Sequence, residues 1–213
     1  MKKFVISLCC VLFTFQTHAV DRTLTAYESN FVQNSSRTAA KLGGYNAVEM
    51  FGDTKGMMIR FIDDDEISKL TGFCSKAMPP ASMASVPGLL KQMKCSPQGT
   101  FVAGHYIGDK NENNLEYIIP TIFLSDSLLG LMKLPYYKIY AAGLIIHEFV
   151  HFYQWKSGSH MNVGTDKMKD EAMCMERRAI ETEAYDIQNK FLELNRVPSF
   201  RNGISSILPK CSV

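Results

Sequence analysis

The sequence predicts an α+β fold in which a small twisted sheet precedes two long helices. Short β-rich segments separated by turns fill the first half of the chain. Residues 135–158 and 169–198, in the second half, have the apolar spacing of helices. Strands and helices that are segregated along the chain in this way are typical of α+β domains.

The first 19 residues have the layout of a secretory signal peptide. Lys2 and Lys3 precede an apolar run that ends at Phe15, and small residues lead up to Ala19. The apolar run is too short to span a bilayer, and no longer one follows. We therefore expect cleavage after Ala19, no stable membrane insertion, and export of residues 20–213 to the periplasm or out of the cell.

The expected mature chain suits one domain and is electrically balanced. Removal of the signal from the 213 residues leaves 194, with no internal repeat. The 23 basic residues include two in the signal, so the mature chain has 21 basic and 21 acidic residues. This balance gives no electrostatic case for binding nucleic acid or an anionic membrane surface. The sequence leaves the oligomeric state open.

Four cysteines remain after removal of the signal, and we expect them to form two disulfides. An even number of cysteines in an exported protein is typical of a disulfide framework. Of the three possible connectivities we favour Cys74 with Cys95 and Cys174 with Cys211. A four-cysteine zinc site is disfavoured because the chain has no Cys-x-x-Cys pair.

The first half of the mature chain is predicted to consist of short elements. Residues 21–60 show mixed helical and β patterns, and strands are expected at 56–62 and 100–108. A short helix at 66–74 follows an acidic run, as the helix dipole favours. Residues 115–125 are β-rich but contain proline, which cannot donate to a strand ladder, so we expect this strand at a sheet edge.

The helix at 135–158 contains ionisable side chains within an apolar run. His147 and His151 stand one turn apart on one face, so both imidazoles can bind the same metal ion. Glu148 lies beside them, where it can take a proton from a metal-activated water. Gly143, one turn earlier, leaves room for a strand or a substrate backbone. The pattern His-Glu-x-x-His predicts a zinc site; the alternative is a buried helix whose histidines are only hydrogen-bonded.

A catalytic zinc site needs a third protein ligand. The metzincin extension would place a histidine at position 157, which is Ser157. The later helix at 169–198 instead offers three carboxylates: Glu181, Glu183 and Asp186. Helical geometry does not separate the two glutamates, because they flank the apolar stripe on opposite sides.

The pairing of "HEFVH" with the later "ETEAYD" resembles the gluzincin metallopeptidases. The resemblance covers residues 115–194, the expected zinc-site core, and implies one Zn²⁺ per chain. Carried over by motif, it implies metal ligands at His147, His151 and Glu181, with Glu148 as the general base. The match departs at Tyr185, where the family often has an aspartate that orients a ligand histidine.

The resemblance also implies a fold detail and an activity. In that family an edge strand lies next to the HExxH helix and pairs with the substrate, and residues 115–125 would fill this role here. The second long helix would carry the third ligand. The implied activity is zinc-dependent hydrolysis of a peptide or protein substrate. Alternatives remain an exported zinc-binding protein without hydrolytic activity, its metal shell closed by His160 or Asp186, and hydrolysis of another amide such as a cell-wall cross-link.

Overall fold

A computed structural model describes residues 24–46, 58–71, 99–102, 106–108, 115–117, 120–135, 137–158, 171–199 and 211. In chain order the elements are helix α1 (Ala26–Gly43), strand β1 (Met58–Ile62), helix α3 (Asp64–Thr71), strands β2 (Gly99–Val102), β3 (Tyr106–Gly108), β4 (Leu115–Tyr117) and β5 (Thr121–Ser125), and helices α5 (Asp126–Met132), α6 (Tyr137–Lys156) and α7 (Glu171–Leu194). A small mixed sheet packs against helices, so the α+β class predicted from the sequence is confirmed.

The three-stranded sheet has the order β1-β5-β2, with β5 parallel to β1 and antiparallel to β2. Strands β3 and β4 form a separate antiparallel pair. The expectation of an edge strand at 115–125 is wrong, because β5 is the central strand of its sheet. Pro120 lies just before β5 and contributes only its carbonyl, which accepts a hydrogen bond from the Met58 backbone N–H at 2.9 Å. The edge strand beside α6 is β2.

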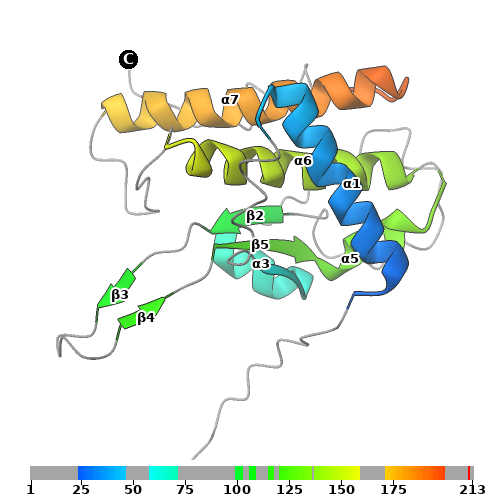
Figure 1. Cartoon of the computed structure of the whole chain (residues 1–213), viewed down its shortest axis with the longest axis horizontal. Helices are drawn as coiled ribbons and strands as arrows, with labels where there is room; N and C mark the ends of the chain where they lie inside the picture. Colours follow the sequence, from blue (N-terminus) through cyan, green and yellow to red (C-terminus); the bar gives the residue numbers. More distant parts are fainter. Residues whose placement is uncertain are drawn as a thin grey trace, which may run out of the picture.

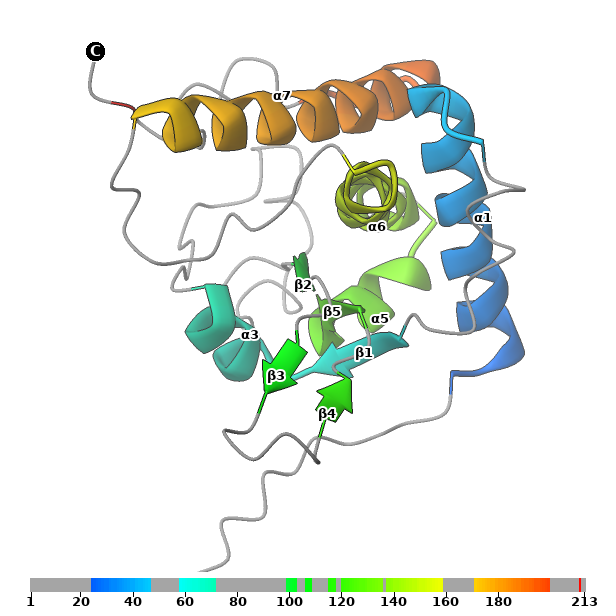
Figure 2. The same cartoon turned by 60° about the vertical axis from the view of Figure 1, so that its left-hand side comes forward.

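Helix α6 is the central element of the fold. Figure 2 looks along its axis and shows α7 on one side, α1 crossing on another, and the sheet with α5 beneath. From Tyr140 to Gln154 every residue is buried except Leu144 and His151, which are partly buried. A helix that is enclosed on all sides has no solvent face on which to place polar groups, so its polar side chains need partners within the protein.

Helices α6 and α7 run antiparallel (Figure 1). At one end of the pair Gly143 faces Leu192, and at the other end Gln154 donates to the Ile180 carbonyl at 3.1 Å. A Cβ added to Gly143 would lie 3.2 Å from Leu192 Cδ2. The room left by this glycine is therefore used by α7, and the expectation that a strand or substrate would use it is wrong.

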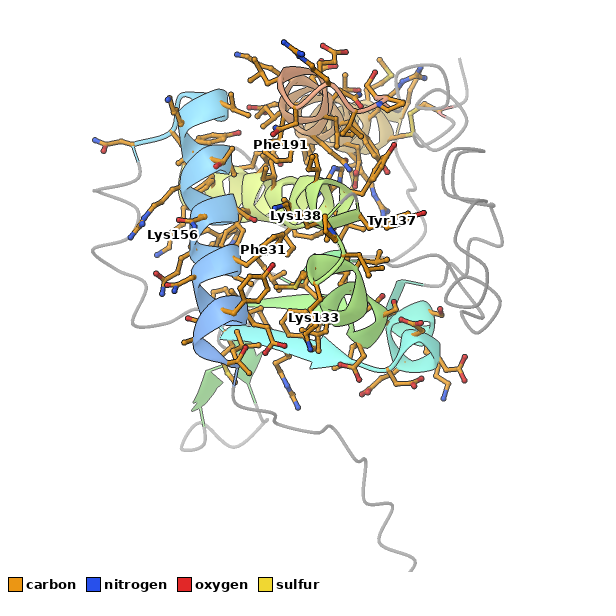
Figure 3. All side chains as sticks on the ribbon, turned by 90° about the vertical axis from the view of Figure 1, so that its right-hand side faces the viewer. Phe31, Lys133, Tyr137, Lys138, Lys156 and Phe191 are labelled. Atoms are coloured by element: carbon orange, nitrogen blue, oxygen red, sulfur yellow. A yellow bond between two sulfur atoms is a disulfide. The ribbon has the colours of Figure 1, made fainter. Side chains whose placement is uncertain are left out.

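Helix α1 is longer than the mixed pattern of residues 21–60 suggests. It begins with a capping box: Thr25 Oγ1 accepts from the Glu28 N–H at 3.3 Å, and Glu28 Oε2 accepts from the Thr25 N–H at 2.9 Å. It ends at a left-handed Gly44 with φ of 73°. Figure 3 shows Phe31 of α1 and Phe191 of α7 beside the shared core.

The predicted disulfide between Cys174 and Cys211 is present and ties the first turns of α7 to the C-terminal segment. The predicted Cys74–Cys95 pair and the signal at residues 1–19 lie outside the described residues. Among the helices that the structure describes, none has both the length and the apolar character needed to cross a bilayer.

Candidate metal centre

His147, His151 and Glu181 come together between α6 and α7. The two Nε2 atoms are 3.0 Å apart, and Glu181 Oε2 lies 3.4 Å from His147 Nε2 and 3.5 Å from His151 Nε2. His147 is 7% exposed, and the other two are partly buried. This group can hold a metal ion, and among the described residues it has these three members.

The spacing of the three donor atoms suits a small divalent cation. In a triangle with sides of 3.0, 3.4 and 3.5 Å, the point equidistant from the corners lies about 1.9 Å from each. Bonds from Zn²⁺ to imidazole nitrogen and carboxylate oxygen are about 2.0–2.2 Å long. Two imidazoles and one carboxylate are also donors that zinc accepts. Geometry and donor chemistry therefore both fit.

The antiparallel packing of α7 on α6 distinguishes the two glutamates between which helical geometry could not choose a third ligand. Glu181 faces α6 and reaches both histidines. Glu183 lies outside the metal group; its carboxylate accepts hydrogen bonds from Gln154 and Tyr45 instead. Asp186 is exposed and lines a groove between α7 and the end of α1, away from the histidines.

The surroundings of His151 favour its positively charged form. Its Nε2 lies 3.0 Å from His147 Nε2, within hydrogen-bond distance. Burial disfavours the charged form of His151, but its hydrogen bond to Glu181 and the charges of Glu181 and Glu148 outweigh burial and raise its pKa to about 9. Burial alone would raise the pKa of Glu181, but hydrogen bonds from both histidines hold it well below its usual range.

Glu148 is 5% exposed and lies against strand β2. A Cβ added to Gly99 would be 2.6 Å from Glu148 Cγ and 2.9 Å from Glu148 Oε1. Glycine at position 99 therefore lets the β2 backbone pass directly over the glutamate. The sequence analysis missed Gly99, because its role depends on the packing of a strand against a helix more than 40 positions later.

Tyr185 occupies the place where the gluzincin pattern often has an aspartate. Its ring centroid is 4.4 Å from that of His147, so it holds the imidazole by packing. The Nδ1 of His147 is buried and has no hydrogen-bond partner among the described residues. Burial and the charges of Glu181 and Glu148 raise the pKa of Tyr185, so its phenol stays protonated beside the site.

Gln154 is a further site residue that the sequence analysis missed. Its side chain is 1% exposed, and its Oε1 lies 2.9 Å from His151 Nδ1. The signal for it was present, since Gln154 lies three residues after His151 and so on the same face of α6.

No known protein family matches the chain, and neither a curated protein nor a solved structure is significantly similar to it. The chemical interpretation of the site therefore rests on its own geometry and on its donor atoms.

The three ligand candidates predict the metal content of the purified protein. We expect about one zinc ion per chain in the wild type and loss of that zinc in His147→Ala and Glu181→Ala, because two remaining donors hold the ion far more weakly. Asp186→Ala removes a carboxylate from the same helix and should keep the metal. Elemental analysis measures the content; zinc retained by Glu181→Ala would contradict the assignment.

The raised pKa of His151 predicts that zinc binding releases protons. Below pH 9 the imidazole carries the proton that a cation must displace, so zinc affinity should rise about tenfold per pH unit between pH 7 and 8. Calorimetry of chelator-treated protein, repeated in buffers of different ionisation enthalpy, should give at least about one proton released per zinc. Binding with no proton release would contradict the raised pKa of His151.

Proposed function

We propose that the protein is an exported zinc-dependent metallopeptidase of the gluzincin type, with His147, His151 and Glu181 as ligands. The observation that carries the proposal is the position of Glu148, a buried carboxylate next to the first ligand in sequence and directly under an edge strand. A glutamate in this place of the His-Glu-x-x-His pattern is the group that takes a proton from a metal-activated water.

Three protein ligands leave a coordination position open, as catalytic zinc requires. When bound, the metal would supply Lewis acidity to a substrate carbonyl and would acidify a water molecule. In the proposed mechanism Glu148 would accept the proton of that water and deliver it to the leaving amine, acting first as general base and then as general acid. Of the two residues considered for closing the coordination shell, Asp186 lies outside the metal group, and His160 lies outside the described residues.

Strand β2 is the proposed guide for the substrate backbone. One edge of β2 pairs with β5, and β2 is the last strand in the order of its sheet. An extended peptide can add to such an edge by backbone hydrogen bonds. Because Gly99 brings β2 against Glu148, a peptide aligned in this way would pass close to the general base. This assigns to β2 the role that the sequence had suggested for residues 115–125.

Export is supported by the chemistry of the chain. The disulfide between Cys174 and Cys211 is typical of proteins that fold in an oxidising compartment. An oxidising compartment is also the destination that the signal-like sequence of residues 1–19 predicts. Export would deliver a single domain spanning residues 20–213 to it.

Substitution Glu148→Gln separates metal binding from hydrolysis. The amide is nearly isosteric but cannot accept the proton, so zinc content should be unchanged while kcat falls at least about 100-fold. Cleavage of a peptide library by mature protein gives the rate, and Glu171→Gln, at the first position of α7, is the control. Wild-type rates in Glu148→Gln would refute the general-base role. A zinc-loaded wild type that cleaves no peptide would refute the peptidase but not the metal site.

Substitution Gly99→Ala tests the approach of β2 to the base. The added Cβ would overlap Glu148 Cγ and lie 2.9 Å from Leu144 Cδ2, so the strand or the glutamate must move. We expect zinc to be retained and kcat/KM to fall at least about tenfold. Gly130→Ala is the matched control, because a Cβ there meets nothing within 4 Å. Equal activity of the two variants would contradict the proposed guide strand.

A further inference from the structure

We propose that Gln154, Glu183 and Tyr45 form a positioning chain that sets how tightly the metal centre binds its ion. The inference rests on the zinc site of the proposed function and adds residues from outside it. The chain runs from His151 on α6 through Glu183 on α7 to Tyr45, just beyond α1, so all three long helices act on one ligand.

The first link fixes which nitrogen of His151 faces the metal. Gln154 Nε2 donates to Glu183 Oε2 at 2.9 Å and to the Ile180 carbonyl at 3.1 Å. With both acceptors on the amide nitrogen, the Oε1 atom must be the one that faces His151 Nδ1, at 2.9 Å. That imidazole nitrogen therefore donates, and its Nε2 is directed toward His147 and Glu181. A partner of this kind orients a metal-binding histidine and makes it a better ligand.

The second link is Glu183, which supports the amide and does not bind the metal itself. Its two oxygens are used separately: Oε2 accepts from Gln154, and Oε1 accepts from the Tyr45 hydroxyl at 2.6 Å. The Tyr45 bond is charge-assisted, which strengthens it, but it lies at the surface, where water screens it. The two glutamates of α7 thus have different roles: Glu181 is a candidate metal ligand, and Glu183 holds the Gln154 amide in place.

The third link ties the carboxylate to α1. The Tyr45 N–H donates to the Ala40 carbonyl at 2.9 Å, and its ring stacks on Tyr153 with centroids 5.2 Å apart. The Tyr153 hydroxyl lies 2.8 Å from Ser36 Oγ of α1. A Cβ on Gly43 would overlap the Tyr45 ring, so glycine there permits this ring position. The end of α1 therefore holds Tyr45 in place.

The test measures the Zn²⁺ dissociation constant of the full mature chain by competition with a chromophoric chelator at fixed pH. Tyr45→Phe and Glu183→Gln remove one donor and one acceptor of the chain, and each should weaken binding about fivefold, the effect of one net hydrogen bond. Gln154→Leu removes the direct partner of His151 and should weaken binding about 10- to 100-fold. The spectrum of the Co²⁺-loaded variants should change with the histidine geometry.

The matched control is Tyr27→Phe. Tyr27 donates to the Met132 carbonyl at 2.6 Å, the same length as the Tyr45 bond, from the opposite end of α1. This variant should bind zinc like the wild type. The melting temperature of each metal-free variant separates loss of stability from loss of affinity. If Gln154→Leu does not fold, Tyr45→Phe and Glu183→Gln still decide the question, because both change the chain at its outer end.

Two results would overturn the inference, and they are distinguishable. If the wild type binds zinc and His147→Ala does not, but Tyr45→Phe and Glu183→Gln match Tyr27→Phe in affinity and in Co²⁺ spectrum, the positioning chain is refuted while the metal site stands. If the wild type and His147→Ala both fail to bind zinc, the metal site of the proposed function is refuted as well.

Discussion

The close antiparallel packing of α6 and α7 is the constraint on which the candidate site depends. Gly143 lets Leu192 approach α6 at one end of the pair. One and two turns further along α6 lie His147 and His151, and the close packing of α7 brings Glu181 within 3.5 Å of both. In this packing the Glu181 side chain spans the distance from α7 to both imidazoles. The shape complementarity of two helices is thus what assembles the three donors.

The burial of α6 gives its polar residues their chemical character. A charged or polar group removed from water is costly unless it finds a partner. His147, His151 and Glu181 lie within 3.0–3.5 Å of one another, where a bound cation would be a partner for all three. Gln154 satisfies this requirement through His151, Ile180 and Glu183. The buried polar side chains of α6 therefore create a site that can stabilise a cation inside an otherwise apolar core.

Local patterns predicted the parts of the structure that depend on helical spacing. The one-turn separation of His147 and His151 and the two long helices followed from positions along the chain, whereas the Cys174–Cys211 pair was one of three connectivities that the sequence left open. Pro120 misled the prediction, because it lies just outside the ladder and leaves β5 free to be central.

Other features depend on approaches between distant segments, which single-sequence patterns do not encode. The choice of Glu181 over Glu183 follows from how α7 lies on α6, and the position of Gly99 follows from how β2 crosses Glu148. Helix α1 is a different case: the capping box at Thr25 and Glu28 was visible in the sequence, and the mixed pattern around it concealed an 18-residue helix.

The disulfide at Cys174 has a consequence for the rotation of α7 about its own axis. Cys174 and Glu181 are seven residues apart, which is about 20° short of two full turns, so both project from nearly the same side of the helix. Glu183 is turned about 200° further round. The cross-link therefore lies on the side of α7 that presents Glu181 to the histidines, two turns before it, and Glu183 projects from the opposite side.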